Sequence, residues 1–87
     1  MSFVHSDLGH LNDNQVVEVT IDRAANVLLM DSTNFSNYRQ GRNYRYFGGQ
    51  AVRSPVRLAV PHSGHWHVAI DLGGGSGSIR SGVRVFG

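Results

Sequence analysis

The stretch HWHVAIDL, residues 65–72, alternates between large apolar side chains and polar or small ones. A two-residue period of this kind is typical of a strand with one face buried and the other in water. It predicts that Trp66, Val68 and Ile70 point into the core and that His65 and His67 point away from it. The fold is therefore expected to consist of strands that each bury one face.

The same pattern continues along the chain on both sides of this stretch. Residues 15–22 alternate in the same way, and residues 27–30 form an apolar run short enough for a strand buried on both faces. Residues 44–52 are expected to form a strand bent at the adjacent glycines 48–49, and residues 79–85 a last strand. With a further strand expected at residues 56–60, where Val56, Leu58 and Val60 alternate with other side chains, these segments predict six or seven short strands.

One segment departs from the strand pattern. N-cap candidates in residues 31–34 precede aromatic residues three positions apart, and Gly41 follows where a helix commonly ends. One or two helical turns are expected at about residues 34–40. The predicted fold is all-β, a small antiparallel barrel or sandwich with one short helical segment, in a single domain of residues 1–87.

Composition agrees with this fold class and limits the chemistry. The 87 residues include 11 Val and 3 Ile but one Glu and no Lys, which disfavours a helical bundle. There is no cysteine, so disulfides, thiolate metal sites and cysteine nucleophiles are excluded. No stretch has the length of a membrane helix, and residues 1–14 do not resemble a signal peptide. The expectation is a cytoplasmic protein without membrane contact.

Three histidines, His62, His65 and His67, lie within six residues. Two of them share a strand face, as metal ligands do, but Asp71 on that face lies roughly 13 Å along the strand. We predict that no transition metal binds tightly, because the third and fourth ligands are missing unless a neighbouring strand supplies them. The simpler interpretation is polar side chains on a wet strand face and in a turn.

An arginine- and aromatic-rich segment contains the other candidate binding residues. Tyr38, Arg39, Arg42 and Arg45 combine rings that stack with cations that pair with phosphate or carboxylate. With His65 and His67, these four residues form the predicted ligand-binding surface of a non-catalytic binding module, for a small anionic ligand or a protein partner. The alternatives are a nucleotide or single-stranded nucleic-acid binder and a histidine-ligated metal protein.

Catalysis is not predicted. The glycine-rich residues 73–77 follow a strand as phosphate loops do, but a strand pattern without a lysine comes next, which favours a long hairpin connection. Ser, His and Asp are all present, yet no Gly-x-Ser-x-Gly elbow fixes their geometry. No catalytic residue and no cofactor is assigned.

The strands at residues 56–60 and 65–72 are expected to pair as a hairpin. Residues directly opposite in an antiparallel pair share a face, so burying both apolar sides requires an odd-numbered connection or a bulge near Gly64. One such register places Arg57 opposite His67.

Motifs along nearly the whole chain resemble one family. They are Ala25-Asn26-Val27-Leu28-Leu29-Met30-Asp31, Asn34-Phe35-Ser36-Asn37-Tyr38, Tyr46-Phe47-Gly48-Gly49, Ser54-Pro55-Val56, Gly64-His65-Trp66-His67-Val68 and Asp71-Leu72-Gly73. The chain is similar to short bacterial proteins known only as a domain of unknown function, sometimes joined to a TIR-type domain. The resemblance implies a cytosolic sensing or binding module and assigns no catalytic residues.

Overall fold

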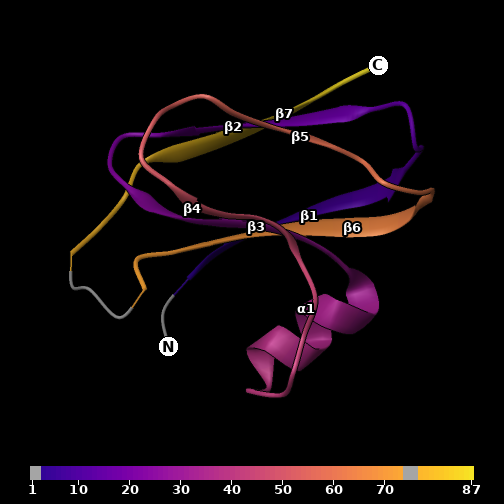
Figure 1. The fold of residues 1–87 in the computed structure, drawn as a ribbon, viewed down its shortest axis with the longest axis horizontal. Helices are drawn as coiled ribbons and strands as arrows, with labels where there is room; N and C mark the ends of the chain where they lie inside the picture. The colour runs from indigo at the N-terminus through magenta and orange to yellow at the C-terminus, as the bar shows by residue number, and fades with distance from the viewer. Residues whose placement is uncertain (1–2, 74–76) are drawn as a thin grey trace.

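Two antiparallel sheets face each other in the computed structural model, which describes residues 3–73 and 77–87 (Figure 1). The larger sheet has the strand order β1-β6-β3-β4, with β1 at Val4–Leu11, β6 at Gly64–Asp71, β3 at Ala25–Asp31 and β4 at Phe47–Ala51. The smaller sheet has the order β5-β2-β7, with β5 at Val56–Ala59, β2 at Val16–Ile21 and β7 at Ser81–Phe86. The sheets do not close on each other, so the predicted all-β fold is confirmed as a sandwich.

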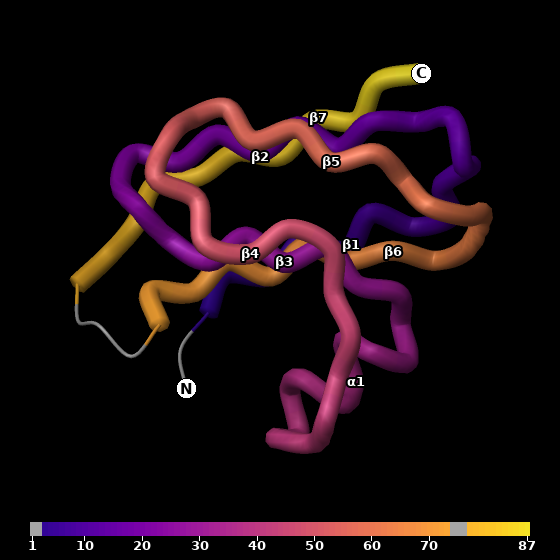
Figure 2. The backbone as a smooth tube through the Cα atoms, viewed as in Figure 1, coloured from indigo at the N-terminus to yellow at the C-terminus, as the bar shows by residue number. Residues whose placement is uncertain are grey.

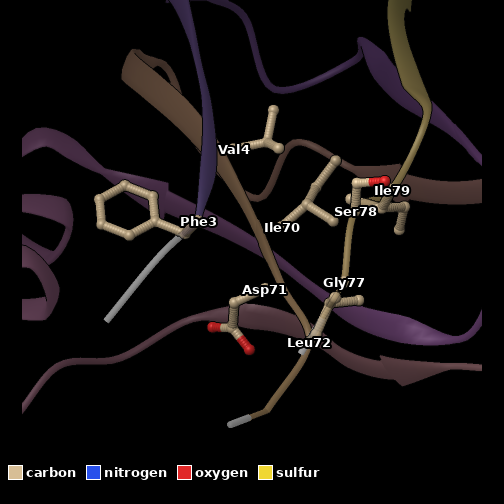
Figure 3. A pocket seen from close by; sticks show the side chains of 8 residues that line it. All are labelled: Phe3, Val4, Ile70, Asp71, Leu72, Gly77, Ser78 and Ile79. Carbon is tan, nitrogen blue, oxygen red and sulfur yellow. The ribbon is translucent and has the colours of Figure 1, made fainter. Parts of the chain in front are cut away.

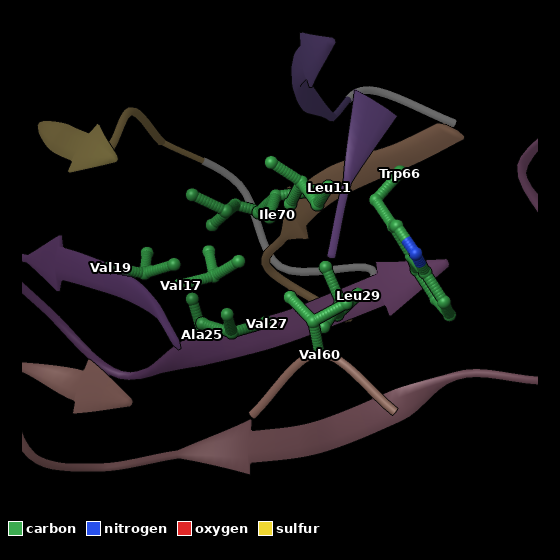
Figure 4. Packing of buried hydrophobic residues seen from close by; sticks show 10 residues of the cluster. Leu11, Val17, Val19, Ala25, Val27, Leu29, Val60, Trp66 and Ile70 are labelled. Atoms are coloured by element: carbon green, nitrogen blue, oxygen red, sulfur yellow. The ribbon is translucent and has the colours of Figure 1, made fainter. Parts of the chain in front are cut away.

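The core lies between the two sheets (Figure 4). Trp66, Val68 and Ile70 all point into it and are at most 1% exposed, as the alternation in residues 65–72 predicts. Other side chains of the cluster come from both sheets and from the chain between them: Leu11, Val17, Val19, Ala25, Val27, Leu29 and Val60. A partly buried layer of aliphatic residues surrounds them.

A single helix of the described chain, α1 at Ser32–Arg39, covers the outer face of the larger sheet (Figure 1). Asp31 is its N-cap, because its side chain accepts a hydrogen bond from the backbone N–H of Asn34 at 2.9 Å. Gly41 follows the helix with φ 75°, a left-handed conformation that glycine adopts without strain. The helix thus begins two residues before the predicted segment and ends where the glycine indicates.

The helix creates a second, smaller core on the side of the sheet away from the first. Its buried members are Leu28, Met30, Phe35, Tyr38 and Ala69, with Phe3 packed against them. This explains the apolar run at residues 27–30, because β3 packs on the sandwich core with one face and on the helix with the other. Strand β6 does the same through Ala69. The prediction of a strand buried on both faces is confirmed.

Strand β4 is shorter than the expected strand at residues 44–52. Gly48 and Gly49 both have positive φ, 109° and 132°. A Cβ on Gly48 would lie 2.3 Å from the carbonyl oxygen of Val27, so glycine is required for β4 to approach β3 this closely. The bend expected at these glycines therefore falls inside the strand.

The predicted hairpin of residues 56–60 and 65–72 is wrong. β5 pairs with β2, whereas β6 pairs with β1 and β3, so the chain crosses from one sheet to the other between them (Figure 2). Val60 contributes to this crossing, its N–H donating to the Gln15 carbonyl at 3.0 Å. Arg57 consequently lies opposite Glu18, not His67, and donates to its carboxylate at 3.0 Å.

The structure also differs from expectation in the N-terminal residues and in the connection between β6 and β7. The N-terminal residues, to which no strand was assigned, form β1 at the edge of the larger sheet. Strands β6 and β7 belong to different sheets, so residues 73–77 do not connect a hairpin; residues 74–76 of that segment lie outside the described part of the chain.

Candidate functional site

A cluster of polar side chains occupies the outer face of β1 and β6, beside the start of the helix. The two strands pair antiparallel with Asp7 opposite His67 and His10 opposite His65. His65 Nε2 donates to Asp7 Oδ1 at 2.6 Å, and both side chains are about half exposed, at 50% and 54%. The predicted outward direction of His65 is therefore correct.

His67 points to the same outer face but is buried, at 7% exposure, so its predicted wet environment is wrong. The helix covers it: the Phe35 ring stacks on the His67 ring with centroids 4.7 Å apart and planes 11° apart. Both ring nitrogens have partners, because Nδ1 lies 2.9 Å from His5 Nε2 and Nε2 lies 2.9 Å from Ser32 Oγ. Burial lowers the pKa of His67, despite the opposing effect of the Asp7 carboxylate.

A β-bulge sets the direction of Asp7. The register of β1 against β6 shifts between Asp7 and Gly9, which leaves Leu8 as the extra residue. Gly9 has φ 68°, and its N–H donates to Asp7 Oδ1 at 2.9 Å. That backbone hydrogen bond, followed by the one from His65, lowers the pKa of Asp7 and keeps it ionised.

Asp7, His65 and His67 form a potential metal-binding group. One potential ligand atom from each lies within 4.8 Å of the other two. No third ligand lies near the two histidines in the sequence, but in the folded chain β1 supplies Asp7. His62 is not in the group: its Nδ1 contacts the Ser63 carbonyl oxygen at 3.2 Å.

Sequence reasoning missed His5 and Asp7. The one signal for them is their two-residue spacing, which places both on one face of a strand. No strand was expected there, so the spacing had no structural meaning. Ser32 and Phe35 were missed because the sequence of a short helix does not determine which sheet face the helix packs against.

The predicted arginine and aromatic residues have separate surroundings. Tyr38 is buried at 3% exposure, and its hydroxyl donates to Asp71 Oδ2 at 2.6 Å. The exposed Arg39 places its guanidinium carbon 5.7 Å from the centroid of the Phe35 ring. Arg42 is exposed beyond the helix end, where its N–H donates to the Asn37 carbonyl at 2.8 Å.

Three aromatic rings after the helix remain exposed. Tyr44, Tyr46 and Phe47 are 37%, 46% and 46% exposed. The rings of Tyr44 and Tyr46 contact each other with centroids 5.7 Å apart, whereas the Phe47 ring contacts Trp66 at 6.1 Å. Arg45 lies among them, and its N–H donates to Asn34 Oδ1 at 2.8 Å. We call Tyr44, Arg45, Tyr46 and Phe47 the aromatic–arginine surface.

A hollow of about 250 Å³ adjoins this surface. Its lining combines an arginine, a carboxylate and aromatic edges: Asp31, Asn34, Arg45, Phe47, His62 and Trp66. The indole N–H of Trp66 is not available in it, because it donates to the His62 carbonyl at 3.0 Å.

A second hollow, of about 230 Å³, opens where the start of β1 meets the end of β6 (Figure 3). Most of its lining is apolar, from Phe3, Val4, Ile70, Leu72 and Ile79. Its one charged residue, Asp71, already accepts hydrogen bonds from Tyr38, Asn26 and Gly73. It offers a ligand little polar chemistry.

The described chain is thus a small β-sandwich with one helix on an outer sheet face, and polar clusters near that helix. The profile of a family described as Domain of unknown function (DUF1883) matches residues 1–87, and the chain belongs to this family. Comparison of the chain with curated proteins and with solved structures found no match. No helix within residues 3–73 and 77–87 has the length and apolar character needed to span a membrane.

Proposed function

We propose that this protein is a small non-catalytic binding module and that the aromatic–arginine surface is where it binds its ligand. The observation that carries the proposal is the exposure of Phe47 beside Arg45 in the lining of the hollow. The exposed rings of Tyr44 and Tyr46, which contact each other, precede it in the chain. Large rings left in water cost free energy that folding would otherwise gain, and such patches commonly mark binding sites.

The ligand that fits is small and anionic and carries a flat ring. The exposed rings offer stacking faces, and the Arg45 guanidinium pairs with phosphate or carboxylate. The hollow, at about 250 Å³, is smaller than the pockets of roughly 300–1,000 Å³ that enclose drug-sized molecules. It therefore suits one ring or one anionic group, with the rest of the ligand lying on the surface.

A binding role is favoured over hydrolysis by the surroundings of Ser32. Its hydroxyl lies 2.9 Å from His67 Nε2, the pairing expected of a nucleophile and its base. In Ser-His-Asp sites a carboxylate orients the other histidine nitrogen, but here His5 occupies that position and Asp7 pairs with His65. The pair therefore lacks the carboxylate that stabilises the charged histidine.

We further propose that the chain is a single domain that works in the bacterial cytoplasm. The absence of cysteine is consistent with a reducing compartment. The resemblance to proteins sometimes joined to a TIR-type domain implies the same location and a sensing or binding role.

Trp66 is the chain's one tryptophan and lines the hollow, so its fluorescence tests the proposal. Adenosine monophosphate should give a saturable change in emission, and inorganic phosphate a much weaker one. Arg45→Gln should weaken binding about tenfold or more, because a charge-assisted contact contributes roughly 1.5–3 kcal/mol. Arg53→Gln, an exposed arginine beyond the far end of β4, is the matched control and should bind normally.

Salt and a longer probe separate the alternatives. Affinity for the nucleotide should fall moderately between about 50 and about 200 mM salt, since few charges are paired. Binding of a single-stranded oligonucleotide alone, with a steep salt dependence, would instead support the nucleic-acid alternative. No response to nucleotide, or equal losses in Arg45→Gln and Arg53→Gln, would refute the proposed surface.

A further inference from the structure

We propose that Asp7, His65 and His67 bind a divalent transition-metal ion of the Zn²⁺ class on the outer face of β1 and β6. Two imidazoles and a carboxylate are ligands that Zn²⁺ and its neighbours in the first transition series prefer. This site is separate from the aromatic–arginine surface, and it contradicts our prediction from sequence that no such metal binds tightly.

The spacing of the ligand atoms suits one ion. At Zn–ligand distances of about 2.0–2.1 Å, the ligand atoms of a tetrahedral site lie roughly 3.3–3.5 Å apart. The three atoms here lie within 4.8 Å of one another, and His65 Nε2 and Asp7 Oδ1 are 2.6 Å apart. Binding one ion would require the 2.6 Å separation to widen to about 3.3 Å and any separation near 4.8 Å to shorten by roughly 1.4 Å.

The group is held in place by contacts outside it. The Gly9 N–H fixes Asp7, and the Phe35 ring stacks on His67. An ion on one nitrogen of His67 would replace one of that ring's two hydrogen bonds. The remaining bond, to Ser32 or to His5, would then orient the ring, as metal-bound histidines generally require.

Access to the site is open on the side of Asp7 and His65, whereas His67 is buried under the helix. The side chains of Asp7 and His65 are about half exposed, so an ion can reach them from solvent without opening the fold. Three protein ligands leave a fourth position for water or for a donor atom of another molecule. The site therefore resembles exchangeable metal sites more closely than closed structural ones.

The test uses untagged full-length protein that a chelator has stripped of metal. Calorimetric titration with Zn²⁺ should give about one ion per chain, and Co²⁺ should produce the visible absorption of a low-coordinate site. Asp7→Asn and His65→Gln should each weaken Zn²⁺ binding by more than about tenfold, since losing even an outer-shell partner costs about 10–100-fold. Both residues are exposed, so these variants are expected to fold.

The matched control is His62→Gln, which removes an exposed histidine outside the group. It should bind Zn²⁺ like the parent protein. Absence of Zn²⁺ binding would overturn the proposal, as would unchanged affinity in the double variant of Asp7→Asn and His65→Gln. An equal loss in His62→Gln would also overturn it, because the histidines would then bind metal without a defined site. These Zn²⁺ titrations do not bear on the nucleotide titration, for which His62→Gln is not a control because His62 lines the hollow.

Discussion

The hydroxyl of Tyr38, on the helix, donates a 2.6 Å hydrogen bond to the carboxylate of Asp71, at the end of β6. Asp71 also accepts from the Asn26 side chain at 2.8 Å and from the Gly73 N–H at 2.9 Å. A buried carboxylate is thus satisfied by three donors from three parts of the chain. This junction fixes the helix on the sheet face that carries His67.

We expect Tyr38→Phe to lower the free energy of unfolding by about 1–3 kcal/mol, because it removes a buried hydrogen bond to a charged group. Urea denaturation measures the loss. Tyr44→Phe is the control: its side chain is partly exposed, and its loss should stay within about 0.5 kcal/mol. Equal values for the two variants would mean that the Tyr38 hydroxyl does not hold the helix.

Stability should fall in acid partly because of Asp71. Burial alone would raise the pKa of its carboxyl, but the hydrogen bonds from Tyr38, Asn26 and Gly73 outweigh burial and lower it below 3.8. A carboxyl with a lowered folded pKa stabilises the protein above its ordinary pKa, and the stabilisation is lost as pH falls through the folded value.

The measurement is a series of urea denaturations from about pH 6 to about pH 2, on the parent protein and Asp71→Asn. The parent should be more stable at pH 6, and the difference should shrink as the carboxyl is protonated. Other acidic groups titrate in both proteins and cancel in the comparison. A difference that does not change with pH would contradict the assignment.

The sequence predicted the strands but not their partners. Periodicity is a local property, so the buried faces of β2, β3 and β6 could be read from it. Pairing depends on contacts between distant segments. The expected hairpin followed the rule that neighbouring strands pair, and here the crossing near Val60 into the other sheet breaks that rule.

The candidate metal site shows the same limit. His65 and His67 were visible as a pair on one face, yet their third ligand lies 58 residues away from His65 in the chain. The burial of His67 depends on Phe35, whose helix could have covered either sheet. The identity of the third ligand and the burial of His67 both depend on the tertiary arrangement.

Trp66→Ala should cost about 3–5 kcal/mol, a large part of the stability of a small domain. The side chain is 1% exposed in the main core, so its removal leaves a cavity that the surrounding residues cannot fill. Trp66→Phe retains most of that volume and should cost clearly less. A loss below about 1 kcal/mol in Trp66→Ala would contradict the packing of the core.

Gly48 and Gly49 provide a matched pair for testing the contact between β3 and β4. Both have positive φ, so alanine strains the backbone at either position. At Gly48 the new Cβ would also lie 2.3 Å from the Val27 carbonyl oxygen, whereas at Gly49 the nearest atom is 4.0 Å away. We expect losses of roughly 2–4 kcal/mol for Gly48→Ala and about 1–2 kcal/mol for Gly49→Ala, measured by urea denaturation. Equal losses would mean that the strands do not approach this closely.

The last prediction connects the β1 bulge with the proposed metal site through Gly9. Gly9 and Gly41 have similar positive φ values, 68° and 75°, and a Cβ at either position would meet nothing within 4 Å. Gly9→Ala and Gly41→Ala should therefore each cost about 1–2 kcal/mol from backbone strain alone.

Their effects on Zn²⁺ binding should differ. The Gly9 N–H holds Asp7, so relaxation of the strained bulge in Gly9→Ala should weaken Zn²⁺ binding by about tenfold, the cost of losing an outer-shell contact. Gly41→Ala, at the far end of the helix, should leave it unchanged. Gly9→Asn should recover much of the lost stability and much of the lost Zn²⁺ affinity, because asparagine tolerates a left-handed backbone better than alanine does. If Gly9→Ala loses stability but binds Zn²⁺ normally, the bulge supports only the strand and does not position the ligand.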